Sequence, residues 1–139
     1  MHLALVQAVK VAQVAQIIIN TQEEVEAFGN KMNLIPLNDE AQLIAIANGN
    51  EPVVLFKHST SCSVSKMAWK MFQQEWNDSV FPVYYLDLLN FRSISNAIAT
   101  QFQISHESPQ VLVIKNGQCT YHASHQSIEA AIVLAELNN

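Results

Sequence analysis

The residue best placed to do chemistry is Cys62, which lies in the serine-rich stretch His58–Ser65. An apolar run precedes this stretch and residues at helical spacing follow it, so the pattern places Cys62 between a strand and the beginning of a helix. Free backbone N–H groups and the positive end of the helix dipole favour a thiolate over a thiol at such a position. Because the thiolate is the nucleophile of disulfide exchange, we predict a reactive cysteine.

The charges around Cys62 differ from those of the chain as a whole. Lys57, His58, Lys66 and Lys70 lie near it in the sequence, whereas the chain carries a formal net charge of −5. Lys57, His58 and Lys66 could hold the carboxylates of a small thiol, although a solvated charge is the simpler interpretation of each. The alternative for Cys62 is a buried cysteine that acts as a small hydrophobic residue, which its serine neighbours disfavour.

The second cysteine and the histidines offer weaker candidates. Cys119 falls on the predicted second arm of a hairpin, where a partly buried cysteine without a mechanistic role is common. A disulfide to Cys62 would require Cα atoms within about 7 Å. His122 and His125 have a three-residue spacing, but a strand end and a helix beginning should direct their side chains apart. We therefore predict no metal site.

Alternating helical and strand patterns would position the serine-rich stretch that contains Cys62. Helical patterns follow Asn38-Asp39, Cys62 and Ser93, and a last one begins near Ser124 with Ile128, Ala131, Ile132 and Ala135 expected inward. Strand patterns cover 52–56, 80–86, 110–114 and 118–122, the last two joined by a hairpin turn at Asn116-Gly117. Strands joined by helices pair in parallel, whereas the hairpin is antiparallel. We predict an α/β fold with a central mixed four-stranded sheet and helices on both faces.

The amino-terminal region has a different pattern. Residues 3–19 are mostly apolar but are interrupted about once per helical turn by polar residues, among them Lys10. This pattern is too interrupted for a membrane span and lacks the basic start of a secretory signal. We predict a helical extension over 1–31, with residues 3–19 packing on a domain at 32–139 or forming a homodimer.

Composition excludes several classes of function. The 139 residues have room for one core, and the acidic balance argues against a nucleic-acid binder. Two cysteines cannot build a disulfide scaffold, and such sparing use of cysteine is typical of the cytoplasm. We therefore expect a cytoplasmic protein that does not enter a membrane.

Three motifs carry a resemblance to a known family. The segments Phe56–Ser65, His106–Val111 and Ser124-His125 resemble the thioredoxin-like YtxJ family, whose members are described as monothiol bacilliredoxins of the bacillithiol system. The resemblance runs from about Met32 to the carboxyl end and implies a thioredoxin-like fold. It makes Cys62 the active-site thiol, with Ser65 in place of a second cysteine. Pro109 would follow a cis peptide bond in a loop facing the thiol; the alternative is a trans proline at the start of an edge strand.

The resemblance implies an enzyme that removes bacillithiol from protein mixed disulfides. Bacillithiol would be the co-substrate, bacillithiolated proteins the partners, and no other cofactor would be needed. Ser61, Val64 and Ser65 would support the thiolate. The substrate would contact Lys57, His58 and the extended segment Ser108-Pro109-Gln110.

Two further interpretations remain open. The same residues would suit exchange with glutathione or coenzyme A, or reduction of peroxides. In the third interpretation the protein is a thioredoxin-like adaptor that binds partners through residues 3–19, and Cys62 is silent. The extension before Met32 departs from the family pattern, so it is either a docking helix or a start site placed too early.

Overall fold

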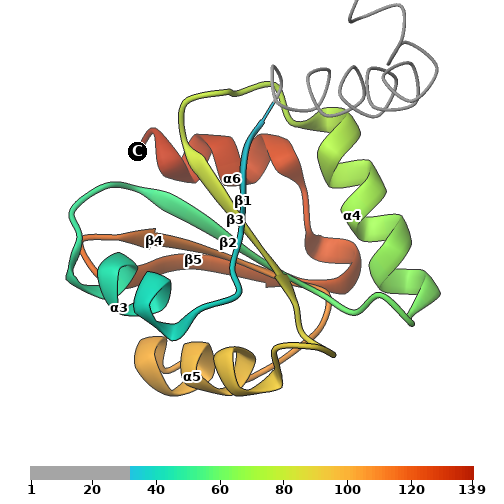
Figure 1. Cartoon of the computed structure of the whole chain (residues 1–139). Coiled ribbons are helices and arrows are strands. Elements are labelled where there is room, and N and C mark those ends of the chain that lie inside the picture. The colour runs from blue at the N-terminus through green and yellow to red at the C-terminus, as the bar shows by residue number, and fades with distance from the viewer. Residues whose placement is uncertain (1–31) are drawn as a thin grey trace, which may run out of the picture.

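The computed structural model describes residues 32–139, so the predicted extension and the dimer through residues 3–19 lie outside the described residues. Residues 32–139 form five strands, four α-helices and a 3₁₀ turn (Figure 1). Their bounds are β1 (Asn33–Pro36), α3 (Glu40–Asn48), β2 (Val53–His58), α4 (Ser63–Glu75), β3 (Pro82–Asp87), α5 (Arg92–Phe102), β4 (Gln110–Lys115), β5 (Gln118–Ser124), η1 (His125–Ser127) and α6 (Ala130–Leu137).

The sheet is mixed, with strand order β1-β3-β2-β4-β5. β3 pairs in parallel with both β1 and β2, whereas β4 is antiparallel to β2 and β5. The predicted four-stranded sheet is wrong by one strand, because β1 was missed. β1 has only four residues and half-buried positions alternate with exposed ones, so it lacks both the apolar run that indicates β2, β3 and β4 and the hairpin turn that indicates β5.

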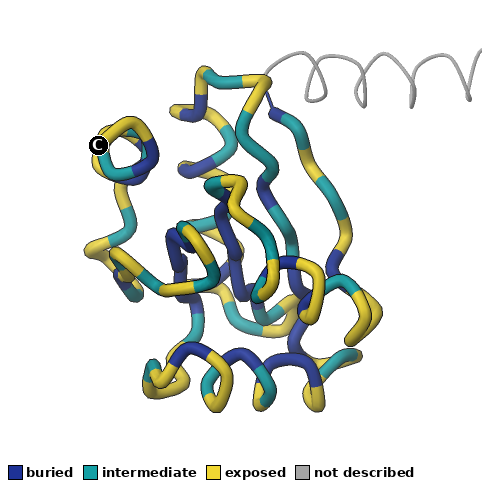
Figure 2. The backbone as a smooth tube through the Cα atoms, turned by 90° about the vertical axis from the view of Figure 1, so that its left-hand side faces the viewer, coloured by how far each residue is buried: buried dark blue, intermediate teal, exposed yellow. Residues whose placement is uncertain are grey.

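Helices cover both faces of the sheet, and the sheet separates two hydrophobic cores (Figure 1). Phe72 of α4, Trp76 directly after α4 and Val133 of α6 are buried on one face. Leu43 and Ile46 of α3 and Ile98 of α5 are buried on the other. Figure 2 shows the buried positions concentrated in the central strands. All six residues of β2 are buried, as expected for a strand with a helical layer on each side.

Alternation along β2 sends its last two residues to opposite faces. Val54 and Phe56 belong to the α4/α6 core, whereas Val53 and Leu55 belong to the α3/α5 core. Because side chains alternate with a period of two, Lys57 lies on the α3/α5 face and His58 on the α4/α6 face.

Local signals at two element ends are confirmed. The Asp39 side chain accepts a hydrogen bond from Ala41 N–H and forms a capping box with Gln42 at the start of α3. Asn116 and Gly117 both have positive φ, 51° and 74°, in the turn between β4 and β5. A Cβ on Gly117 would also collide with the carbonyl oxygen of Ala47, so the turn needs glycine for packing as well.

The predicted beginnings of two helices are wrong. α5 begins at Arg92 after Phe91 rather than at a Ser93 cap, and α6 begins at Ala130 after η1 rather than near Ser124. The inward face of α6 is Ala130, Val133 and Leu137, whereas Ala131, Ile132 and Ala135 are exposed. The run from Ala130 to Ala135 is apolar all round the helix, so its pattern does not single out a face.

Within residues 32–139, every helix is too short or too polar to cross a membrane.

Candidate functional site

Cys62 lies at the beginning of α4, as the sequence predicted. It is the N-cap residue, with an extended backbone, and its carbonyl accepts the Lys66 N–H at 3.0 Å. Its own N–H donates to the Ser59 carbonyl at 3.2 Å, and its thiol is free and half-buried. An N-cap side chain lies near the N–H groups of the second and third helical residues, here Val64 and Ser65, which have no acceptor within the helix.

Ser65 ties the cysteine loop to the end of β2. Its hydroxyl is fully buried, accepts a hydrogen bond from Ser59 N–H at 2.9 Å and is hydrogen-bonded to His58 Nδ1 at 2.7 Å. These are its partners within the described residues, and Cys62 Sγ is not one of them. The Ser65 hydroxyl therefore shapes the loop that carries the thiol.

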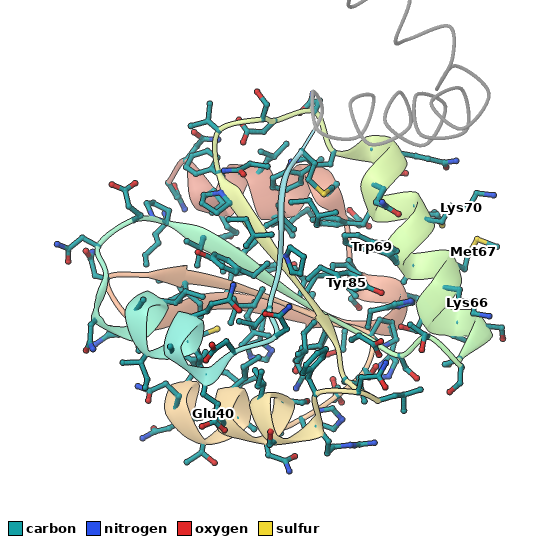
Figure 3. All side chains as sticks on the ribbon, in the orientation of Figure 1. Glu40, Lys66, Met67, Trp69, Lys70 and Tyr85 are labelled. Carbon is teal, nitrogen blue, oxygen red and sulfur yellow. The ribbon has the colours of Figure 1, made fainter. Side chains whose placement is uncertain are left out.

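His58 is a packed ring rather than a solvated charge, so that interpretation of its side chain is wrong. Its ring centroid lies 5.6 Å from that of Tyr85 and 6.4 Å from that of Trp69. Burial lowers the pKa of His58, an effect that Asp87 and Ser65 partly oppose. Figure 3 shows Trp69 and Tyr85 together on the inner side of α4, while Lys66, Met67 and Lys70 point away.

Lys57 is also not solvated, because its side chain is fully buried on the opposite face. Its ammonium group donates to His106 Nδ1 at 2.7 Å and to Gln110 Oε1 at 3.1 Å. Since an ammonium group has no acceptor, His106 Nδ1 accepts and the ring proton lies on Nε2. Burial, followed by the charge of Arg92, lowers the pKa of Lys57 to about 8. The ammonium is thus enclosed, and in this arrangement it does not reach a molecule bound at the surface.

The loop before β4 contains the candidate proline. The Ser108–Pro109 peptide bond is cis, as the resemblance implied, and the trans alternative is wrong. Pro109 is buried, and its carbonyl accepts the His125 N–H at 3.0 Å. The Gln110 side chain faces the interior and donates from Nε2 to the Ser105 carbonyl at 3.0 Å. The Gln110 side chain and the Pro109 carbonyl are therefore already engaged within the protein, whereas the backbone groups of Ser108 have no hydrogen bond to the rest of residues 32–139.

The sheet brings the cysteine loop and the proline loop to the same end. β2 runs toward Cys62 and ends at His58, while the antiparallel β4 begins at Gln110, which pairs with Lys57. Both loops are thus joined to neighbouring strands at the same end of the sheet.

Cys119 lies at the opposite end of the sheet. It pairs with Ile114, four residues along β4 from Gln110, which corresponds to about 14 Å along a strand. That separation is larger than the Cα distance a disulfide to Cys62 would allow. Burial raises the pKa of Cys119, whose thiol donates to the Tyr121 carbonyl at 3.3 Å.

Residues 32–139 contain no cluster of three or more His, Cys, Asp or Glu side chains arranged to hold a metal ion.

Two features of the site had no role in the sequence interpretation. His106 belongs to the motif His106–Val111, and no local sequence pattern indicates its hydrogen bond to Lys57. An apolar groove of about 450 Å³ also lies beside Cys62, lined by α4 and by His125, Gln126 and Ile128. Met67 and Met71 line it and are exposed, although they have the helical spacing of core residues.

Comparisons with known proteins agree with this arrangement. The family model of the monothiol bacilliredoxin BrxC matches residues 35–133, more than half of the chain. A solved protein described as having a thioredoxin fold is 28% identical, with a TM-score of 0.67 over 77% of this chain and 95% of that one.

Thioredoxins share the fold at lower identity. Thioredoxin from Trypanosoma brucei brucei is 11% identical, with a TM-score of 0.60 over 78% of this chain and 90% of that one. Thioredoxin from Schistosoma mansoni is 17% identical, with a TM-score of 0.58 over 76% and 94% of the two chains. Taken with the family match, these similarities show that the chain has a thioredoxin-like fold and belongs to the monothiol bacilliredoxin family.

Proposed function

We propose that this protein removes bacillithiol from protein mixed disulfides by monothiol exchange at Cys62. The observation that carries the proposal is the place of Cys62 as the N-cap residue of α4, at the end of the sheet that also holds the cis-proline loop. The family match supports a role in thiol redox chemistry, and the site supplies the residues for it.

The reaction has two exchange steps. The Cys62 thiolate attacks the bacillithiol sulfur of the mixed disulfide, so that a Cys62–bacillithiol disulfide forms and the substrate cysteine leaves as a thiolate, which takes a proton from water. The thiolate of a second bacillithiol then attacks the sulfur of the bound bacillithiol. This step produces bacillithiol disulfide and returns Cys62 as a thiolate.

The first turn of α4 suits this monothiol course. A second cysteine three residues after Cys62 would compete for the mixed disulfide, and Ser65 cannot. The N–H groups of Val64 and Ser65 would donate to the thiolate, as they would to an N-cap oxygen. The exposed Ser61 flanks the thiol in the same loop and completes the proposed support.

The protein substrate would bind along the proline loop. The backbone of Ser108-Pro109-Gln110 is proposed to pair with an extended segment around the modified cysteine. His58 would contribute through the cysteine loop, because its ring is packed beneath that loop. Bacillithiol would be the co-substrate, and the reaction would run in the cytoplasm, where thiols are kept reduced.

Intact-mass spectrometry tests this proposal. Wild type, Cys62→Ala and the matched control Cys119→Ala are each mixed with a model protein that carries a bacillithiol mixed disulfide. We expect the bacillithiol mass to move to wild type and Cys119→Ala only. A Cys62→Ala variant that removes bacillithiol as fast as wild type would contradict the scheme.

A parallel reaction with the glutathione mixed disulfide tests the choice of small thiol. Faster transfer of glutathione would favour the alternative co-substrate. Transfer of neither thiol would favour the adaptor interpretation, in which Cys62 is silent.

A further inference from the structure

We propose that Lys57 is a positioning residue that holds the proline loop, residues 105–110, in the shape that receives an extended protein substrate. The inference rests on the proposed function for the identity of that substrate. It assigns Lys57 to the interior of the site, in place of the surface contact that the sequence suggested.

The hydrogen bonds of Lys57 join both sides of the loop. Its ammonium group donates to His106 and to Gln110, which flank Ser108-Pro109 on either side. The Gln110 amide extends this network to the loop backbone, because Oε1 also accepts the Glu107 N–H at 3.4 Å and Nε2 donates to the Ser105 carbonyl. We refer to Lys57, His106 and Gln110 as the lysine network.

The buried polar side chains gather at the end of the sheet that carries the site. Five polar or charged side chains are buried within residues 32–139: Lys57, His58, Ser65, Ser95 and Gln110. His58 and Ser65 serve the cysteine loop, and Lys57 and Gln110 serve the proline loop. Ser95 joins the second group, since its hydroxyl lies 3.3 Å from His106 Nδ1. The last two residues of β2 therefore each hold one loop: Lys57 holds the proline loop, and His58 holds the cysteine loop.

Burial of an ammonium group at this position costs free energy of hydration. Val53 and Leu55 precede Lys57 on the same face of β2 and pack in an apolar core, where a hydrocarbon side chain would avoid the loss of hydration. The charged groups that act on Lys57 and His106 are Arg92, on α5, and Glu107, in the loop. A buried polar group of this kind specifies one geometry, because its partners lose their hydrogen bonds in any other.

Loop geometry affects binding of the substrate more than the reactivity of the thiol. The attacking sulfur must lie in line with the disulfide, and the backbone of the proline loop would set the orientation of the substrate. A loosened loop should therefore raise the KM for a protein mixed disulfide, while Cys62, held by the separate network of Ser65 and His58, keeps its reactivity.

The test compares Lys57→Met, which has no donors, with the matched control Lys70→Met, which removes an exposed lysine from α4. We expect Lys57→Met to raise KM for the bacillithiolated model protein about tenfold, with kcat and the iodoacetamide alkylation rate of Cys62 nearly unchanged. Lys70→Met should leave all three unchanged. An unchanged KM in folded Lys57→Met protein, or a fall in the alkylation rate, would overturn the proposal.

Amide hydrogen exchange provides a second measurement that does not need activity. The Glu107 amide should exchange about tenfold faster in Lys57→Met, whereas the Val113 amide in β4, which reports on the fold, should not change. If wild type does not accept bacillithiol, the proposed function fails, and the exchange rate of Glu107 still decides the role of Lys57. Equal rates in Lys57→Met and wild type would contradict it.

A third variant keeps the proposal testable if Lys57→Met does not fold, because His106→Ala by itself should also raise KM without changing the alkylation rate of Cys62, and an unchanged KM would contradict the proposal. His106→Ala changes an exposed side chain and removes one partner of the same hydrogen bond. The effects of Lys57→Met and His106→Ala on KM should be less than additive in the double variant. Full additivity would show that the two residues act independently and would exclude the lysine network.

Discussion

At the scale of single residues, Cys62 takes the place that an oxygen-bearing side chain holds in α3. The Asp39 carboxylate caps α3 by accepting the Ala41 N–H, whereas α4 begins at Cys62 without a side-chain hydrogen bond. The N–H groups at the beginning of α4 are thus left for a thiolate or for an incoming disulfide. The loop that presents the thiol is held instead by the buried hydroxyl of Ser65.

Replacement of Ser65 should therefore cost stability. Ser65→Ala leaves Ser59 N–H and His58 Nδ1 without their shared partner, so we expect the free energy of unfolding to fall by about 1–3 kcal/mol in urea denaturation. Ser63→Ala, at an exposed position two residues earlier in α4, is the control and should have little effect. Equal losses in the two variants would contradict the role of the buried hydroxyl.

The charge of Lys57 should be visible in the titration of His106. Burial first, then the charges of Lys57 and Arg92, lower the pKa of His106 below its usual value. Lys57→Met removes one of these charges, so the pKa of His106 should rise in an NMR titration. Lys70→Met should leave the titration unchanged, and an unchanged His106 in Lys57→Met would show that the two groups are not paired.

At the scale of elements, β2 organises the site because it is buried on both faces. Its period of two sends His58 to the cysteine loop and Lys57 to the proline loop, although the two residues are adjacent in the sequence. The hairpin of β4 and β5 is fixed at its other end by the turn at Asn116-Gly117.

Substitution of Gly117 should weaken the hairpin. Gly117→Ala would strain a residue at φ 74° and force its Cβ against the Ala47 carbonyl, so we expect a loss of at least about 1 kcal/mol in the free energy of unfolding. Gly49→Ala is the matched control, because φ is −88° there and the new Cβ would lie 3.0 Å from the Ala45 carbonyl. A larger loss in Gly49→Ala than in Gly117→Ala would refute this account.

At the scale of the whole molecule, the buried lysine links stability to pH. The pKa of Lys57 is about 8 in the folded protein against an ordinary value of 10.5, so the unfolded chain binds more protons between these values. The penalty for burying the charge is complete below pH 8 and disappears as pH rises to 10.5. The free energy of unfolding of wild type, relative to that of Lys57→Met, should therefore increase by about 3 kcal/mol over this window.

Urea denaturation of both variants at several pH values measures this difference. The comparison cancels the titration of the tyrosines, the cysteines and the other lysines, which the two proteins share. A difference that is constant from pH 7.5 to 10.5, or that falls, would contradict a buried and charged Lys57.

Local patterns in the sequence were sufficient to predict much of the fold. The position of Cys62 between a strand and a helix, the doubly buried β2 and the Asn116-Gly117 turn each depend on neighbouring residues, whose backbone preferences act wherever the chain is placed. The family motifs added the cis bond before Pro109, which periodicity alone does not indicate.

Three features depend on contacts between distant segments of the chain: the buried face of α6, the place of β1 in the sheet, and the roles of Lys57 and His58. The ammonium group of Lys57 meets His106 and Gln110, which lie 49 and 53 positions further along the chain. Without these partners a lysine is read as a solvated charge, because its burial is tolerated only where hydrogen bonds replace the lost water. Local backbone preferences thus fix where the thiol lies, whereas packing between distant segments fixes the loops around it.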